Sequence, residues 1–218
     1  MIAAMMNFAV SRSAALIRKA LAMLGVLYFN APLLAIADGI ETSGQAPYEQ
    51  CGYCHEYDGN TSMGNYPKLA GQKVQYLIKQ LHDYRSGRRD GQGMMQGTTS
   101  LLSDQDITTV AEHFSMQQRT LDKVSESEPD RKLAQTVYNN GIPDRQVVAC
   151  KLCHQSMDSR IPNLSGQHAE YIAMQLHAFK NKTRRNDPAT FMQFTAERLS
   201  DQEITALSQF IAAGDNQK

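Results

Sequence analysis

A cysteine-containing pentapeptide that occurs twice is the feature that most constrains this chain of 218 residues. Residues 51–55 read CGYCH, and residues 150–154, 99 positions further on, read CKLCH. Four more landmarks recur in the same order, at offsets of 95 to 97 residues. They pair 66–72 with 161–167, 76–82 with 171–177, Met95-Gln96 with Met192-Gln193, and 102–107 with 199–204. The sequence therefore contains an internal repeat, which predicts two copies of one structural unit.

Each copy has the apolar periodicity of helices. In the first copy, apolar residues fall at i, i+3, i+4 and i+7 over 74–81 and again over 107–114, and the second copy keeps much of this pattern. Such spacing gives a helix one apolar face. Ser103 and Ser200, each with an acidic residue three positions on, predict the N-caps of the last helix of each copy. Alternating β patterns are absent from the sequence, so we expect an all-α fold.

A polar segment separates the two copies. Residues 117–130 are rich in Ser, Glu and Asp, which is typical of a linker. We expect an N-terminal domain over 38–118, a linker over 119–129 and a C-terminal domain over 130–218, opened by a helix at 131–138. Domains of this size bury a modest core and often need a covalent or metal-based support.

The first 37 residues read as an export signal. They lack acidic side chains, carry three basic ones, and continue through an apolar stretch from Ala20 that ends in Ala35-Ile36-Ala37. This pattern predicts a signal peptide cleaved after Ala37; an uncleaved membrane anchor is the alternative. The remaining residues hold 19 basic and 22 acidic groups, a balance that gives no electrostatic footprint for nucleic acid.

The four cysteines point to covalently attached cofactors. An even cysteine count in an exported protein usually indicates disulfides, but Cys-x-x-Cys-His is the attachment motif of c-type haem. We expect two haem c groups, one on Cys51 and Cys54 and the other on Cys150 and Cys153. A zinc site would not explain why His directly follows each pair, and a thioredoxin-like dithiol should accompany a βαβ pattern, which is missing.

Histidine and methionine are the expected axial ligands of each iron. His55 and His154 follow the attachment cysteines directly. Met95 and Met192 lie in polar, poorly helical stretches, each seven residues before the same Leu-Ser-Asp-Gln, where a loop could return to the haem. Met ligation raises the potential and closes the sixth position. The competing candidates are Met94 in the first copy, Met174 in the second, and the repeat-equivalent pair His82 and His177.

Five arginines follow the middle helix of the two copies. They are Arg85, Arg88, Arg89, Arg184 and Arg185. We interpret them as a solvated surface, with pairing to haem propionates or to the carboxylates of a partner protein as the alternative.

These motifs together resemble the cytochrome c4 family of diheme class I cytochromes c, over nearly all of the chain beyond the leader. The resemblance implies two tandem class I cytochrome c domains with their haems close together, a periplasmic location, and electron delivery towards a terminal oxidase. It also implies that the backbone carbonyls of Pro67 and Pro162 accept the second N–H of His55 and His154. The chain departs from the family where 181–183 replaces the Ser-Gly turn at 86–87, which leaves the shape of that loop open.

The favoured function is a one-electron carrier rather than an enzyme, since nucleophile motifs, paired carboxylates and phosphate loops are missing from the sequence. We expect a membrane quinol-oxidising complex or a dehydrogenase as donor, a terminal oxidase as acceptor, and peripheral membrane association as an option. A cytochrome subunit of a dehydrogenase, such as one with a flavin partner, is the second hypothesis. A diheme peroxidase, which needs an open or displaceable iron ligand, is the third.

Overall fold

The computed structural model describes residues 44–90, 93–123 and 127–214. The described residues from Gln45 onward form one compact unit, while the expected leader at 1–37 lies outside the described residues. Within the described ranges the chain is helical, with one isolated β-bridge between Ile142 and Val147. In the same part of the chain, no helix has the length and apolar character needed to cross a bilayer.

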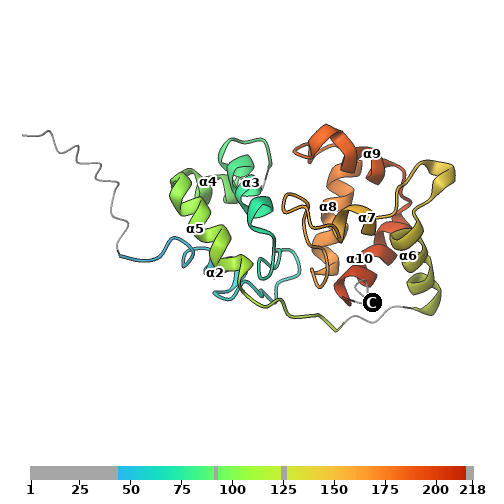
Figure 1. Cartoon of the computed structure of the whole chain (residues 1–218), viewed down its shortest axis with the longest axis horizontal. Helices are drawn as coiled ribbons and strands as arrows, with labels where there is room; N and C mark the ends of the chain where they lie inside the picture. The colour runs from blue at the N-terminus through green and yellow to red at the C-terminus, as the bar shows by residue number, and fades with distance from the viewer. Residues whose placement is uncertain (1–43, 91–92, 124–126, 215–218) are drawn as a thin grey trace, which may run out of the picture. The chain divides into compact units, whose positions relative to one another are not determined.

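In its described residues, the first copy contains four helices around one core (Figure 1). They are α2 (Gly52–His55), α3 (Val74–Arg85), α4 (Met94–Ser100) and α5 (Asp104–Ser115). Their buried apolar side chains form one cluster: Leu77, Leu81, Leu102, Ile107, Val110, Ala111 and Phe114. The positions predicted from the helical period therefore do face the core.

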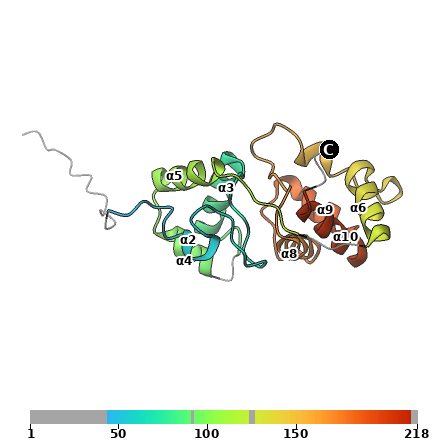
Figure 2. The same cartoon turned by 90° about the horizontal axis from the view of Figure 1, so that it is seen from below.

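The second copy repeats this arrangement and adds a helix at its start (Figure 2). Its helices are α6 (Glu128–Asn140), α7 (Lys151–His154), α8 (Ala169–Lys180), α9 (Phe191–Glu197) and α10 (Asp201–Ala212), with short 3-10 turns at Pro143–Arg145 and Pro188–Thr190. α10 packs against both α6 and α8. The core includes Tyr138, Ile172, Leu199, Ile204, Leu207 and Phe210. α7 to α10 correspond to α2 to α5.

The predicted N-caps of the last helices are confirmed. Ser103 precedes α5 and Ser200 precedes α10, and each forms a full capping box with the acidic residue three positions on. In each box the serine oxygen accepts from the backbone N–H of that acidic residue, whose carboxylate accepts from the serine N–H. This exchange satisfies helix-end N–H groups that lack partners within the helix.

The expectation of an irregular stretch around the two candidate methionines is wrong. Met95 lies in the first turn of α4, and Met192 lies in the first turn of α9. In α9, the carboxylate of Asp187 accepts from the backbone N–H of Met192 (2.7 Å) and of Gln193 (3.2 Å). A capping interaction from outside the helix thus compensates for a sequence with weak helical signals.

The altered turn after α8 keeps the shape of its counterpart. Gly87 has φ 71° and Lys182, 95 positions on, has φ 59°. Each backbone N–H donates at 3.0 Å to the carbonyl three residues earlier, on Tyr84 and Phe179. The second copy therefore places a lysine in a left-handed conformation that glycine adopts at lower cost.

Two glutamines link the copies reciprocally. The Oε1 of Gln72 accepts from the N–H of Asn163 (2.8 Å), and its Nε2 donates to the carbonyl of Asn163 (2.9 Å). Gln167 makes the same pair of hydrogen bonds to Lys68, at 2.8 and 2.9 Å. Each glutamine ends the Pro-x-Leu-x-Gly-Gln motif of its own copy, so the repeated motif also binds one copy to the other.

The segment between the copies makes specific contacts with both. Asp122 accepts from the buried Nζ of Lys68 (2.6 Å) and lies 2.6 Å from Nδ1 of His168. The Nε donor of Arg119 lies 2.7 Å from the carbonyl of Ala70. The described part of the predicted linker therefore contacts both copies. The boundaries at 118/119 and 129/130 remain a prediction.

Candidate haem sites

Each attachment motif forms a single helical turn. Cys51 is the N-cap of α2 and Cys150 is the N-cap of α7, and each helix ends at the histidine of its motif. All four cysteines are partly buried and free. Burial raises the pKa of the Cys51 and Cys150 thiols to about 11. Disulfides, the default for an exported protein, are absent from the described residues.

The two motif histidines are held in one tautomer. Nδ1 of His55 lies 2.9 Å from the carbonyl oxygen of Pro67, and Nδ1 of His154 lies 3.1 Å from that of Pro162. A carbonyl oxygen can only accept, so Nδ1 carries the proton and Nε2 keeps its lone pair. Burial also lowers the pKa of both histidines, which favours the neutral imidazole that ligates metals.

The candidate methionines differ in their surroundings. Met95 is partly buried and packs against the same core as Cys51. Its neighbour Met94 is 54% exposed, and its sulfur lies 3.9 Å from the hydroxyl of Tyr66. Met192 is partly buried, whereas Met174 is 41% exposed. In both copies the packing therefore favours the methionine that precedes Leu-Ser-Asp-Gln.

The alternative histidine pair has a less suitable environment. His82 lies in the last turn of α3, where its Nδ1 accepts from the guanidinium of Arg85 at 2.9 Å and lies 4.0 Å from the carboxylate of Asp104. His177 has the equivalent place in the last turn of α8. These contacts direct a ring nitrogen of His82 to a surface ion pair.

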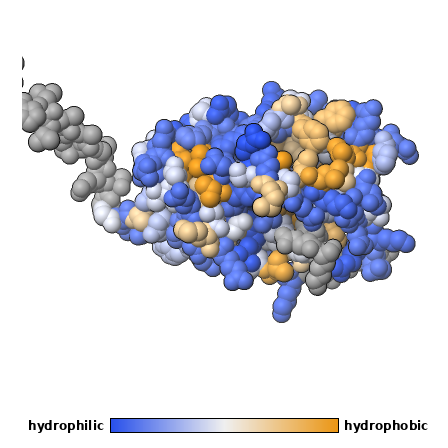
Figure 3. Space-filling model, in the orientation of Figure 1, coloured by the Kyte–Doolittle hydropathy of each residue, from blue (hydrophilic) through white to orange (hydrophobic). Residues whose placement is uncertain are grey.

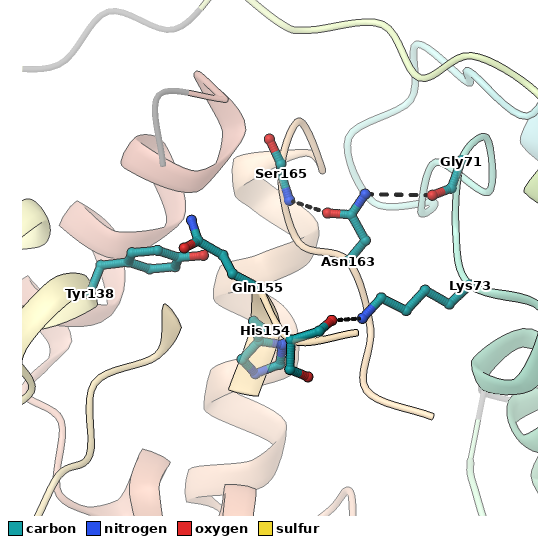
Figure 4. A pocket seen from close by; sticks show the side chains of 8 residues that line it. Gly71, Lys73, Tyr138, His154, Gln155, Asn163 and Ser165 are labelled. Carbon is teal, nitrogen blue, oxygen red and sulfur yellow. Dashed lines mark hydrogen bonds between the residues drawn. The ribbon is translucent and has the colours of Figure 1, made fainter. Parts of the chain in front are cut away.

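Two buried polar atoms without partners lie close in sequence to the candidate ligands of the second copy. Ser156 Oγ and Thr195 Oγ1 are buried and lack a hydrogen-bond partner. They lie within three residues of His154 and Met192, respectively. A cavity of about 380 Å³ adjoins His154, and its lining includes Lys73 and Tyr138 (Figure 4). Cysteines outside any disulfide, histidines with an available Nε2 and partly buried methionines in both copies fit a thioether-linked haem.

Apolar side chains are exposed near both candidate sites. In the first copy they include Tyr53 at 74% and Leu101 at 77%, and in the second Leu152 at 63% and Phe191 at 45%. Figure 3 shows apolar surface in the regions of α4 and α9.

The buried carboxylate of Asp83, which lies beside one of the arginines that follow α3, gives a pH-dependent prediction. Asp83, with 3% of its side chain exposed, accepts from Lys79, from Nδ2 of Asn186 (2.7 Å) and from Nε of Arg88 (3.0 Å). Burial acts to raise the pKa of Asp83, but these donors outweigh it and the pKa is lowered. Its stabilisation is therefore complete above the unfolded pKa of about 3.9 and is lost as pH falls through the folded pKa.

We expect Asp83→Asn to lower the free energy of unfolding by about 1–3 kcal/mol near pH 7, since charged hydrogen bonds are lost. Near pH 3, roughly at or below the unfolded pKa of the carboxyl, the difference should shrink. Urea unfolding of the wild-type protein and of Asp83→Asn at both pH values measures this difference. The exposed Glu112→Gln is the control and should show no such pH-dependent difference; an equal loss at both pH values for Asp83→Asn would contradict the assignment.

The fold and the paired sites together define a class, the diheme c-type cytochromes with two class I domains. The comparisons agree with this assignment. The sequence profile of the family Cytochrome c matches residues 42–116 and 132–215, one segment per copy. Cytochrome c4 of Pseudomonas aeruginosa is 40% identical over 187 residues, covering 82% of this chain and 90% of the relative.

A solved structure and a second relative extend the comparison. The crystal structure of reduced recombinant cytochrome c4 from Pseudomonas stutzeri matches with a TM-score of 0.69 and 34% identity, covering 78% of this chain and 99% of that one. A thiosulfate dehydrogenase electron acceptor of Stutzerimonas stutzeri is 32% identical, covering 74% of this chain and 77% of the relative. The chain belongs to the cytochrome c4 family, and it carries two covalently bound haem c groups.

The sequence did not reveal that a set of polar residues on α3 and α8 makes contacts between the copies. Tyr76 and Gln80 recur as Tyr171 and Gln175 at an offset of 95, and each accepts a hydrogen bond from an arginine of the other copy. Their recurrence was the available signal, because the helical core accounts for the repeated apolar residues but not for repeated polar ones.

Proposed function

We propose that this diheme electron-transfer cytochrome is a periplasmic one-electron carrier whose irons are ligated by His55 and Met95 in the first copy and by His154 and Met192 in the second. The observation that carries the proposal is the repetition of one arrangement. Each copy pairs a neutral histidine, with its Nε2 lone pair available, with a partly buried methionine; His55 is buried and His154 is partly buried.

This residue set suits electron transfer better than catalysis at the iron. The haem supplies an iron that cycles between the ferric and ferrous states. The carbonyls of Pro67 and Pro162 orient the histidines, as is usual for ligand imidazoles. A methionine at the sixth position leaves no site for a substrate, which disfavours the peroxidase alternative.

The export pattern at 1–37 and the family support a periplasmic location, with cleavage after Ala37. We propose a quinol-oxidising membrane complex or a dehydrogenase as donor and a terminal oxidase as acceptor. A second candidate, the electron acceptor of a dehydrogenase, is favoured by similarity to thiosulfate dehydrogenase electron acceptors, 32% and 31% identical to this chain.

Stopped-flow spectroscopy of the purified, haem-loaded protein tests the carrier role. Reduced protein mixed with membranes that contain a terminal oxidase should be reoxidised rapidly, with two electrons delivered per molecule. Oxidised protein mixed with thiosulfate dehydrogenase and thiosulfate reports the second candidate. Turnover of hydrogen peroxide at a rate that matches or exceeds oxidase-dependent reoxidation would overturn the carrier assignment.

A further inference from the structure

A strained turn leads into the helix that carries Met192. Ala189 has φ 52° and ψ 25°, and Thr190 has φ 55° and ψ 23°. Both residues therefore lie in the left-handed region, which costs free energy for a residue with a side chain. Such a backbone persists only where surrounding contacts hold it in place.

One carboxylate makes the contacts that hold this turn. The Oδ2 atom of Asp187 accepts from the backbone N–H of Met192 (2.7 Å) and of Gln193 (3.2 Å), and its Oδ1 accepts from Nε2 of Gln193 (2.8 Å). Asp187 lies just before the turn, and its donors lie just after it, in the first turn of α9. The carboxylate therefore ties the two ends of the strained turn together.

These contacts act on Met192 through its backbone. Gln193 is 8% exposed, so the amide that binds Asp187 is packed inside the protein. None of the ion pairs in the described part of the chain includes Asp187, and its hydrogen bonds go to N–H groups of α9 instead. Hydrogen bonds to a charged acceptor are stronger than those between neutral groups. A single side chain therefore restrains the start of α9.

The first copy has the same pattern on a different backbone. An aspartate, Asp90 or Asp187, precedes the candidate methionine by five residues in each copy, and a glutamine follows that methionine. The residue 97 positions before Thr190 is Gly93, which has φ 77° and is the N-cap of α4. Glycine adopts this conformation at little cost. The copies therefore share the aspartate, but at this left-handed position only the second copy carries a strained side chain.

The backbone restraint limits how far the sulfur of Met192 can move from the iron. A methionine ligand closes the sixth position, so an added ligand such as imidazole binds only after the iron–sulfur bond has broken. In this exchange a ferric iron–sulfur bond is replaced by a ferric iron–nitrogen bond, and no electron is transferred. The rate of imidazole binding therefore reports how firmly the methionine is held.

We propose that Asp187 is a positioning residue for the second haem, because it holds the strained turn at 188–190 in the conformation that keeps the sulfur of Met192 on the iron. The proposal rests on the assignment of Met192 as the axial ligand under the proposed function. The carboxylate and the strain act in opposite directions. Loss of the carboxylate should release the turn, and removal of the strain should make the carboxylate less important.

Stopped-flow measurement of imidazole binding to the ferric, haem-loaded protein tests the proposal. In Asp187→Ala we expect the rate at the second haem to rise at least about tenfold, the factor that one hydrogen bond to a charged group contributes, while the rate at the first haem stays within about twofold. Asp187→Asn keeps one acceptor oxygen and should give a smaller rise. Adding Thr190→Gly to Asp187→Ala should reverse part of the rise, because glycine relieves the strain.

Two control variants complete the design. Glu197→Ala removes an exposed carboxylate at the other end of α9 and should leave both rates within about twofold, as surface substitutions usually do. Met192→Ala opens the second site and identifies its kinetic phase, and adding Asp187→Ala there should cause no further change. A Met192→Ala protein that retains the whole methionine–ferric absorption band would refute the ligand assignment itself, whatever the Asp187 variants show.

Three results would overturn the proposal while leaving the ligand assignment intact. The first is an unchanged rate at the second haem in folded Asp187→Ala, and the second is an equal rise at both haems, which would indicate a general loosening of the fold. The third, a rise that Thr190→Gly does not reduce, would refute the role of strain. If Asp187→Ala does not fold, Asp187→Asn is measured alone, with an expected rise of at least about threefold; an unchanged rate there also contradicts the proposal.

Discussion

Replacing Met192 by alanine is expected to lower the reduction potential of the second haem while the first keeps its own. The expected fall is on the order of 0.1 V or more, since axial ligands tune haem potentials over roughly 0.8 V and a thioether raises them. The absorption band characteristic of a methionine–ferric bond should lose about half its intensity, since one of two such haems is affected. Spectroelectrochemical titration of the purified protein measures the potentials.

The control for this experiment is Met174→Ala, which removes a 41% exposed methionine from α8. It should leave both potentials and the ferric band unchanged. In the first copy, Met95→Ala against Met94→Ala makes the same comparison. If Met174→Ala or Met94→Ala lowers the band by about half while the proposed ligand variant leaves it unchanged, the ligand assignment in that copy is wrong.

Replacing Phe114 by alanine is expected to lower the free energy of unfolding by about 3–5 kcal/mol, the usual range for removing a fully buried phenylalanine. Phe114 is 0% exposed, packs edge-on against His113 with ring centroids 4.9 Å apart, and lies in the core that Cys51 and Met95 adjoin. Urea unfolding of the haem-loaded protein, followed by circular dichroism, measures the loss.

Met116→Ala is the matched control, because Met116 lies two residues further on and is 78% exposed. It should change the free energy of unfolding by less than about 0.5 kcal/mol, as surface substitutions usually do. A similar loss in both variants would mean that Phe114 does not organise the first core.

The local parts of the fold could be predicted from the sequence. The apolar spacing at 74–81 and at 107–114 corresponds to α3 and α5, and both capping boxes form at the expected serines. These features depend on residues within a few positions of one another. The helix around Met192 could not be predicted in this way, because its first-turn N–H groups are satisfied by Asp187, which precedes it across a 3-10 turn.

The candidate sites show the same difference between residues that are close in sequence, which could be predicted, and residues that meet only in the fold. Attachment cysteines and their histidines are adjacent in the chain, so the spacing alone indicates them. The choice of Met95 over Met94 stays a prediction from the spacing to Leu-Ser-Asp-Gln, and the packing of Met95 against the core supports it. The cross-copy contacts of Arg89 and Gln72 depend on how the two copies meet, which the period of each helix does not encode. The sequence indicates these contacts between the copies only through polar residues that repeat at one offset.

The mass of the attachment peptides tests the central claim most directly. After proteolysis of the protein purified from a host that matures c-type cytochromes, the peptide containing 51–55 and the peptide containing 150–154 should each carry the mass of one haem. This result would not depend on where the leader is removed. Two unmodified peptides, with their cysteines free or joined in disulfides, would contradict the account.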